Sequence, residues 1–342
     1  MANAVFSPKD FKVLLVKETT TGSTPTIDSG NVCSQLDVDS VGFPSLNINQ
    51  VTAVRTHANG GRILHQDDFF QDNTMRAIEL SISGTFHKDQ GHAMLLYSLT
   101  DEAYIAEDGS LTNAVVTSGQ TGDTGKYGEA EANKTFSIIL ASPDTNDGKN
   151  IVLSGCVCTN FTLSADMGTD GGLYKYSATV STGRKPTFTG GASEQTPSVT
   201  AYSGNHISMS GIDVSETKIH SLASPILSSF EIAIDHPAVY TGVDETNGYA
   251  CFGRGEELSI TANATIKYDS LTRDLFSTFE TGAVDTADAF TINQNTDSNA
   301  SIQIPSAVLT DVSFNEGDVM MLNVAQKAVA GDSGAVLTID LT

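Results

Sequence analysis

Residues 257–279 read "ELSITANATIKYDSLTRDLFSTF", and residues 79–99 read "ELSISGTFHKDQGHAMLLYSL". Both stretches begin Glu-Leu-Ser-Ile, pass through a lysine to an aspartate, and end in closely spaced apolar residues. The first part of each alternates apolar and polar side chains, which is typical of a β-strand with one buried face. The chain therefore contains the same local pattern twice, far apart in its sequence.

A short helix is expected after each of these strands. Apolar residues follow Asp89 and Asp269 at spacings of three to five, which fits one face of a helix. The predicted helix caps are Asp89 and Asp269 (or Ser270), because such side chains accept hydrogen bonds from the free backbone N–H groups of a first turn.

The similarity extends on both sides of the two stretches. Upstream, "FPSLNINQ" at 43–50 resembles "SPILSSFEIAI" at 224–234. Downstream, "LSGCVCTNFTLS" at 153–164 parallels "IPSAVLTDVSFN" at 304–315. Turn-forming segments rich in Gly, Asp and Asn separate the strand-like runs. These matches predict a tandem duplication of one β-rich domain.

The duplication defines the domain boundaries. The first domain is expected at 1–190 and the second at 204–342, with a Pro/Gly/Ser/Thr-rich linker at 191–203. Residues 101–134 have only a much shorter counterpart in the second copy. Their Gly, Thr and acidic residues predict a surface insertion.

The charge is strongly negative, with 18 Lys and Arg against 41 Asp and Glu and a formal net charge of −23. Binding to nucleic acid through clustered cations is therefore not expected. The negative charge either keeps the protein soluble or forms a surface that repels a polyanion. We expect no membrane segment and no secretory signal, because no apolar run is long enough and the N-terminus lacks a basic segment before an apolar one.

Catalytic and cofactor motifs are absent from the sequence, so we expect no enzyme and no cofactor. The stretch "GQTGDTGKYG" imitates a phosphate-binding loop, but Gly119 is one residue too far from Lys126 and Tyr127 replaces the required Ser or Thr. Cys156 and Cys158 lack a second ligand pair at zinc-site spacing, so they are expected to be small buried strand residues. No catalytic or metal-binding residue is predicted.

Three stretches together resemble the major tail tube proteins of tailed bacteriophages, particularly the long two-domain type. They are "GEELSITANATIKYDSLTRDLFSTFETG", "IQIPSAVLTDVSFNEGDVMMLNVAQKAVAGDSGAVLTIDL" and "LSGCVCTNFTLSADMGTDGGLYKYSATVSTGRKP". The resemblance covers roughly residues 43–186 and 224–342.

The resemblance implies an all-β fold with one short helix per domain, each domain a β-sandwich or partial barrel. Strands of six domains would close into a ring-shaped β-barrel, so three duplicated chains would form a pseudo-hexameric ring. Stacked rings would form a virion tail tube, assembled from protein made in the bacterial host cytoplasm. The implied partners are further copies of the chain, a tape-measure protein, a tail terminator and distal tail or baseplate proteins. Phage DNA would pass through without specific binding.

The barrel assigns the alternate side chains of each strand to a core or to the channel. Leu80, Ile82 and Phe86, with Leu258 and Ile260, are expected in the core. Lys175 and Lys267 do not fit a cation-poor wall, and each either lies on the outer face or pairs with a carboxylate. The residues predicted to face the channel are Glu79, Ser81, Ser83, Asp166, Glu257, Ser259, Thr261 and Asp311.

Two alternatives remain from the sequence. A surface or tail-tip β-sandwich that binds carbohydrate or a receptor, or a glycan-active enzyme, would also be acidic and rich in Asn and Thr. The chain has no Trp for stacking on a sugar, which disfavours this class. A virion decoration protein of similar fold is the second structural alternative.

Overall fold

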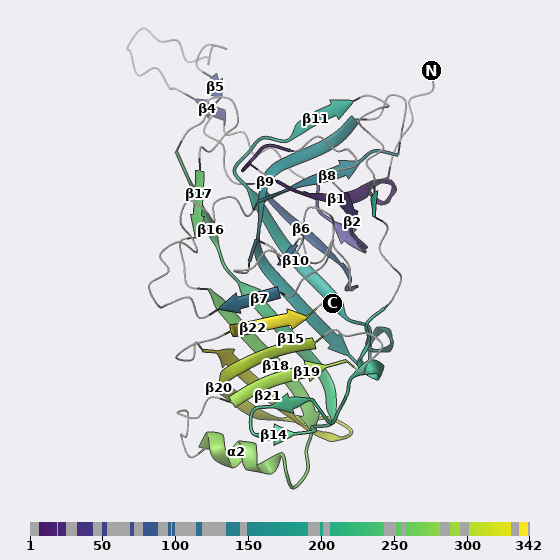
Figure 1. Ribbon diagram of the computed structural model, residues 1–342, viewed down its shortest axis with the longest axis vertical. Coiled ribbons are helices and arrows are strands. Elements are labelled where there is room, and N and C mark those ends of the chain that lie inside the picture. Colours follow the sequence, from purple (N-terminus) through teal and green to yellow (C-terminus); the bar gives the residue numbers. More distant parts are fainter. Residues whose placement is uncertain are drawn as a thin grey trace, which may run out of the picture.

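The computed structural model describes residues 7–18, 20–24, 33–43, 50–52, 69–71, 78–87, 95–96, 98–99, 114–117, 135–143, 149–190, 199–200, 206–242, 251–254, 258–280, 288–294, 301–329 and 335–340. These residues form a fold that is almost entirely antiparallel β-sheet, with one complete short α-helix (Figure 1). Their strands do not close into a barrel within the single chain.

The first half of the chain forms two sheets that share one long strand. The upper sheet has the order β2–β1–β8–β9–β11, and the lower one has the order β3–β6–β10–β9. The shared strand is long enough for its first part to pair in one sheet and its second part in the other. The strands are β1 (Lys12–Lys17), β2 (Cys33–Gln35), β3 (Ser40–Val41), β6 (Ile78–Thr85), β8 (Phe136–Ala141), β9 (Lys149–Asp166), β10 (Lys175–Thr182) and β11 (Thr187–Gly190).

The second half repeats this arrangement with its own long strand, β20. One sheet has the order β14–β13–β19–β20–β22, and the other has the order β15–β18–β21–β20. The strands are β13 (Lys218–Ile219), β14 (Leu222–Ala223), β15 (Leu227–Asp235), β18 (Ser259–Lys267), β19 (Asp288–Asn293), β20 (Ser301–Glu316), β21 (Met320–Ala328) and β22 (Ala335–Asp340).

The remaining elements are short and lie at the periphery of the two halves. Two separate hairpins pair β4 with β5 and β16 with β17. The elements are β4 (Gln50–Thr52), β5 (Phe69–Gln71), β7 (Ala114–Thr117), β12 (Val199–Thr200), β16 (Ala238–Thr241), β17 (Cys251–Arg254), the 3-10 turns η1 (Pro8–Asp10), η4 (Asp170–Gly172) and η5 (Met209–Gly211), and α2 (Arg273–Glu280).

The two halves also share their ladder irregularities. The β9–β10 ladder shifts register at Thr179/Val180, where Thr159 of β9 is the extra residue, and the β20–β21 ladder shifts at Leu309/Asp311, where Thr310 is the extra residue. A second shift recurs in the β8–β9 and β19–β20 ladders. Bulges at matching places indicate that β9 and β20 occupy the same position in their halves, because a bulge fixes the local register of its strand.

The ladders correct one part of the sequence comparison. Matching the two Glu-Leu-Ser-Ile motifs places Ser81 with Ser259. In the structure, Thr179 and Ala325 are equivalent, because each pairs with the residue that follows the bulge of its long strand. Ser81 lies opposite Thr179, whereas Asn263 lies opposite Ala325. Ser81 therefore corresponds to Asn263, four residues further along. The motif comparison still assigned the faces consistently, because an even shift keeps a side chain on the same side of a strand.

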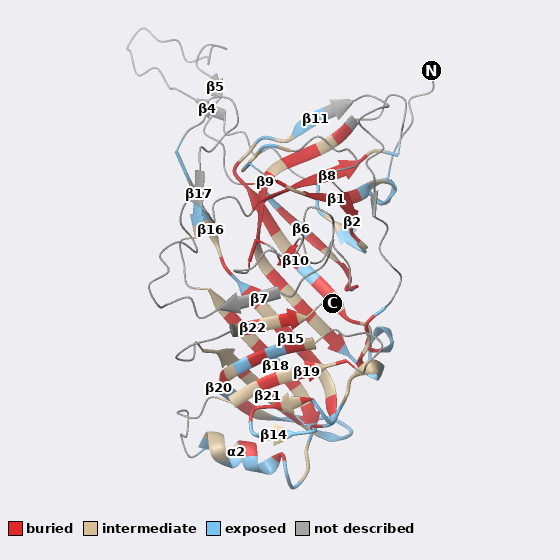
Figure 2. Ribbon diagram, viewed as in Figure 1, coloured by how far each residue is buried: buried red, intermediate tan, exposed pale blue. Residues whose placement is uncertain are grey.

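The longest described ladder between the halves pairs β9 with β15, from Asn160 opposite Asp235 to Asp166 opposite Ser229, and a shorter one pairs β7 with β22. The hydrophobic core is continuous across this junction, as the buried stripe along the strands shows (Figure 2). Leu80, Ile82 and Ile260 are buried in this core as predicted. Phe86 is also buried there, and Leu258 packs against it partly exposed.

Arg254 of β17 fastens the same junction. Its guanidinium donates hydrogen bonds to the carbonyl oxygens of Ser98 (2.7 Å), Cys158 (3.0 Å) and His236. Ser98 and Cys158 belong to the first half, whereas Arg254 and His236 belong to the second. Because this partly buried cation binds carbonyl acceptors from both halves, it resists their separation.

The predicted cap Asp269 lies in the turn before α2, which begins at Arg273. The Asp269 carboxylate accepts backbone N–H bonds from Leu271 (2.9 Å) and Thr272 (3.1 Å) in the turn that leads into the helix. These N–H groups of Thr272 and Leu271 lower the pKa of the Asp269 carboxyl below its usual value. In the first half Leu95 and Leu96 are helical and buried, whereas the predicted cap Asp89 lies outside the described residues.

The predicted insertion and linker both contribute strands. Within 101–134, β7 pairs antiparallel with β22 of the second half. Within the predicted linker 191–203, β12 pairs in parallel with β2. The predicted linker thus contributes two residues that extend the sheet of the first half beyond β2.

A buried carboxylate organises the upper sheet of the first half. Glu18 is 1% exposed and accepts four hydrogen bonds. The donors are the hydroxyls of Thr135 and Ser137, both at 2.6 Å, and the backbone N–H groups of Gly22 (2.6 Å) and Gly155 (2.8 Å). Both glycines have positive φ, a conformation that brings their N–H groups to the carboxylate and disfavours a side chain.

We predict that Glu18→Gln lowers the free energy of unfolding by about 2–3 kcal/mol, because hydrogen bonds to a buried charged group are strong and the amide nitrogen would face donors. Glu280→Gln, at an exposed position on α2, should change it by less than about 0.5 kcal/mol. Chemical denaturation followed by circular dichroism measures both. Equal effects of the two substitutions would contradict the role assigned to Glu18.

Candidate functional site: the polar face of the main sheet

The most extended surface feature is one face of the sheet formed by both halves, which we call the main sheet. Its strand order is β6–β10–β9–β15–β18–β21–β20. Apolar side chains alternate with polar ones along these strands, so one face is the core and the other is polar. The polar face consists of the residues Glu79, Ser81, Ser83, Asn160, Thr162, Ser164, Asp166, Lys175, Ser177, Thr179, Ser229, Glu231, Ala233, Asp235, Ser259, Thr261, Asn263, Thr265, Asp311, Ser313, Asn315, Asn323, Ala325 and Lys327.

Cross-strand neighbours carry the polar face from one half to the other without a break. Ser164 of β9 lies opposite Lys175 of β10 on one side and opposite Glu231 of β15 on the other. Glu231 in turn lies opposite Asn263 of β18. Side chains in such directly opposed positions are near neighbours, so this row is a continuous surface of short polar groups.

The centre of the polar face is hollowed into a groove of about 570 Å³. It is bordered by strands β9, β15, β18, β20 and β21 and by the η4 turn. Four carboxylates and one lysine line it, together with hydroxyl and amide side chains. The charged lining residues are Asp166, Asp170, Lys175, Glu231 and Asp311.

The structure brings most of the predicted channel residues onto this one face. Seven of the eight occupy it, and Asp166 and Asp311 both line the groove. The eighth, Glu257, lies outside the described residues. The seven are Glu79, Ser81, Ser83, Asp166, Ser259, Thr261 and Asp311.

The sequence comparison missed several members of the face. Glu231 and Asp235 on β15 are exposed and add two carboxylates beside β9. Their strand was matched only loosely to 43–50, so no face was assigned to it. The alternation within "FEIAID" could have predicted this face, because Phe230 and Ile232 are buried and Glu231 between them is exposed.

Lysines are present on the polar face, although the sequence predicted a channel wall with few cations. Lys175 lies on it, on the same side as the predicted channel residues, and pairs with a carboxylate, which is one of the two options left open for this residue. Lys267 is exposed at the end of β18 and shares the parity of the polar side chains. Lys327 of β21, opposite Thr261, was not predicted.

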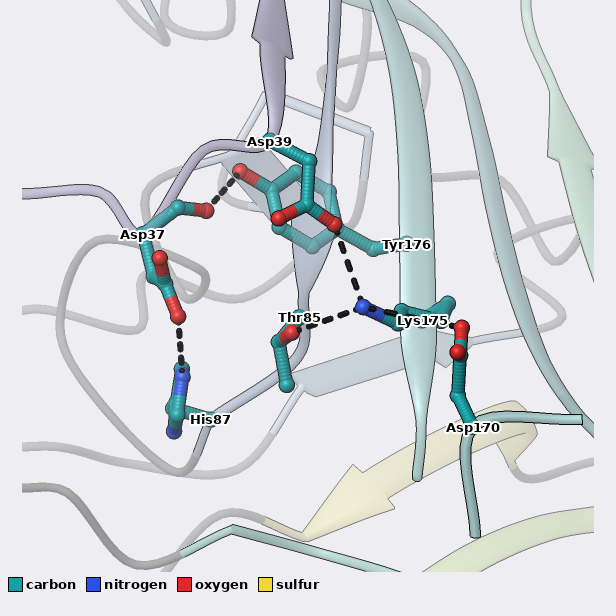
Figure 3. A network of polar contacts seen from close by, with 7 residues as sticks. All are labelled: Asp37, Asp39, Thr85, His87, Asp170, Lys175 and Tyr176. Atoms are coloured by element: carbon teal, nitrogen blue, oxygen red, sulfur yellow. Dashed lines mark hydrogen bonds and ion pairs between the residues drawn. The ribbon is translucent and has the colours of Figure 1, made fainter. Parts of the chain in front are cut away.

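The Lys175 ammonium belongs to a polar network at the edge of β6 and β10 (Figure 3). Its Nζ lies 3.1 Å from Asp39 Oδ2, 3.0 Å from Thr85 Oγ1 and 4.0 Å from Asp170 Oδ2. Two carboxylates therefore offset this cation locally, and it offers little free positive charge to an anion on the polar face.

The same network holds the segment that leads into β3. Tyr176 Oη donates to the carbonyl oxygen of Asp37 at 2.8 Å, and His87 Nε2 lies 2.7 Å from Asp37 Oδ2 (Figure 3). Backbone N–H groups of Asp39 and Gly42 donate to β6 carbonyls at 2.8 Å. The segment 37–42 is thus fixed from both its side chains and its backbone.

The cysteines are structural, as expected from the sequence. Cys156 and Cys158 are both 0% exposed. Burial raises the pKa of the Cys158 thiol to about 12, and burial followed by the nearby Glu18 charge raises the pKa of Cys156. Neither thiol ionises near neutral pH, so neither is a reactive nucleophile.

Other candidate chemistry has no support in the part of the chain that the structure describes. There, no cluster of three or more His, Cys, Asp or Glu side chains could hold a metal ion. The imitation phosphate loop at 119–127 lies outside the described residues. No helix within the described ranges is long and apolar enough to span a membrane.

Comparison with known proteins adds no family assignment. No protein-family model matches the sequence, and no curated protein matches it.

We predict that Lys175→Met lowers the free energy of unfolding by no more than about 1 kcal/mol, because its ion pairs are solvent-exposed. Tyr176→Phe should instead increase hydrogen exchange at the Asp39 and Gly42 amides several-fold, since it frees a buried carbonyl contact of the same segment. Native-state exchange by mass spectrometry or NMR compares the two variants. Faster exchange in Lys175→Met than in Tyr176→Phe would contradict this ranking.

Proposed function

We propose that this chain is a structural virion protein of a tailed bacteriophage. Three copies form a ring of six similar β-units, and the rings stack into the tail tube through which DNA leaves the particle. The polar face of the main sheet forms the tube wall. The observation that carries this proposal is the continuity of that face across both halves through the β9–β15 ladder.

Repetition of the ladder within one chain supports the ring. Each half contributes the same order of strands to the main sheet, and each half places short polar side chains on the same side. A surface made by repeating a unit side by side can be extended by further copies in the same way. Closure of such a sheet also removes edges that would otherwise pair without control.

The chemistry of the polar face supports a conduit for DNA. Glu79, Asp166, Glu231, Asp235 and Asp311 supply five carboxylates, which outnumber the two lysines of the face, Lys175 and Lys327. The Lys175 cation is in addition offset by its partners. A carboxylate repels a phosphate by only about 1 kcal/mol at 4 Å in water, and salt screens it further. Repeated around each ring, this small repulsion keeps DNA centred, whereas a free lysine would hold each passing phosphate.

The alternative is a β-sandwich that binds carbohydrate or a receptor in the 570 Å³ groove, whose hydroxyls, amides and carboxylates could donate and accept hydrogen bonds. Aromatic rings are the usual platform for a sugar, and none is found among the described side chains of the polar face. A wide wall without such a platform favours the tube.

The tube proposal also defines partners and location. The chain would contact its own copies within and between rings, and it would meet a tape-measure protein, a tail terminator and distal tail or baseplate proteins. DNA would pass without specific binding. The protein would be made in the bacterial host cytoplasm and would reside in the virion.

We predict that the purified protein forms rings or tubes with a central hole in negative-stain micrographs. Native mass spectrometry of isolated rings should give three times the 36.0 kDa of one chain. The reason is that two similar halves per chain need three chains for six units. A ring of six chains, or dispersed monomers that bind glycans on an array, would contradict the proposal.

Charge reversal on the polar face tests the wall directly. Glu79→Lys combined with Asp311→Lys should leave tubes intact but slow DNA ejection several-fold at low ionic strength, since each new cation attracts phosphate. The matched control is Asp274→Lys combined with Glu280→Lys on α2, which changes the net charge equally. Ejection from assembled particles is followed by dye fluorescence. Equal rates for the two double variants at low salt would show that these residues do not face the DNA.

A further inference from the structure

We propose that the free edge of β20 pairs with the segment 40–43 of a second copy of this chain, in the register of the β9–β15 ladder. Phe43 of one chain then lies opposite Phe314 of the next. The inference rests on the proposed ring and specifies how one chain meets its neighbour.

The template is the junction already present within the chain. In β9–β15, Leu163 lies opposite Ile232 and Ser164 lies opposite Glu231. Leu163 and Ile232 are each 1% exposed, so this ladder buries an apolar pair on the core side. It also satisfies the backbone groups along both strand edges.

The second part of β20 corresponds to the second part of β9. The bulges at Thr310 and Thr159 fix the equivalence, so Phe314 takes the place of Leu163 and Asn315 the place of Ser164. β9 pairs on both sides here, with β10 and β15. Over Leu309–Glu316, β20 pairs with β21, and no other described strand occupies its second edge.

The segment that begins with β3 corresponds to β15. Ser40 and Val41 pair with Ser83 and Ile82 of β6, as Ser229 and Phe230 pair with Thr265 and Ala264 of β18. The β6–β10 and β18–β21 ladders make Ser83 equivalent to Thr265 and Ile82 equivalent to Ala264.

Continuing this register along the segment gives the remaining equivalents. Gly42 takes the place of Glu231, and Phe43 takes the place of Ile232. The sequence comparison had instead matched 43–50 with 224–234, which places Pro44 with Pro225. The ladders thus assign 40–43 to the position that β15 holds in the second half.

Each of the two strand edges carries an exposed aromatic side chain in a position that is buried at the β9–β15 junction. Phe43 is 37% exposed and Phe314 is 39% exposed, although both have the parity of core residues. Their equivalents Ile232 and Leu163 lie opposite each other across the junction, and both are buried. A second copy placed by the same register brings Phe43 onto Phe314, which buries both aromatic side chains.

Both edges are held ready for pairing. Asp37 and Asp39 anchor the segment before β3 through Tyr176, His87 and Lys175 (Figure 3). On the other edge, Phe276 of α2 stacks on Phe314 with ring centroids 5.0 Å apart. Pre-formed edges lose little conformational entropy on association, which favours one register over sliding.

Cysteine cross-linking tests the register in the full chain. The variant carries Gly42→Cys with Asn315→Cys, because the template places these positions directly opposite. A side chain fits at Gly42, where a Cβ would meet its nearest neighbour at 3.6 Å, and Asn315 is exposed. Under oxidation, denaturing electrophoresis should shift most protein from one chain to covalent multiples that end at three. Mass spectrometry should find the disulfide between positions 42 and 315.

The matched control is Gly42→Cys with Asp311→Cys. Position 311 lies on the same face of β20 but four residues away, about 13 Å along the strand and beyond the reach of a disulfide. Covalent product should fall at least about tenfold relative to the 42/315 pair, as expected for cysteines too far apart to bond.

A second variant, Phe43→Asp, should keep the circular dichroism of the wild type and abolish rings in micrographs. If rings form without the 42/315 cross-link, or cross-link equally at 42/311, the proposed pairing of β20 with 40–43 is wrong, but the proposed tail tube is not contradicted. A wild-type chain that stays monomeric overturns both. The 42/315 cross-link in closed trimers that never stack supports the register and overturns the tube.

Discussion

The register of the β9–β15 ladder is the constraint on which the rest of the structure depends. It joins the main-sheet strands of the two halves, and it aligns their alternation so that the large apolar side chains of both halves contribute to one core. A slip of one residue at this ladder would turn the polar face of one half into the core of the other. Arg254, which binds carbonyls of both halves, and the buried Ile232–Leu163 pair hold the register in place.

The long strands β9 and β20 explain how such a small repeat makes two sheets. Each begins in an upper sheet and continues into the main sheet, with a bulge near the change. A bulge leaves one residue unpaired, but it bends its strand and increases the twist, so one strand can serve two sheets. Glu18 and its four donors stabilise the first of these upper sheets beside Gly155.

The polar face and the free edges suggest a protein whose activity lies in assembly. Its groove has hydroxyls, amides and carboxylates, and its Lys175 cation is balanced by Asp39 and Asp170. A polyanion such as DNA could pass along such a surface without being bound by it. The exposed Phe43 and Phe314, by contrast, are apolar side chains in core positions, which is the composition expected where a neighbouring copy completes the core.

The sequence by itself determined the class of fold and the polar face, because strand alternation has period two and is readable in "ELSI" and "FTLSAD" without tertiary information. It also placed Asp269 at the start of a helix. It misaligned Ser81 with Ser259 and 43–50 with 224–234, since an even shift leaves the apolar pattern unchanged. Only the tertiary structure decided which strands are neighbours, that Lys175 meets Asp39, and that no described strand pairs with the second edge of β20 over Leu309–Glu316. These depend on ladders between residues far apart in the chain, and local pattern carries no information about them.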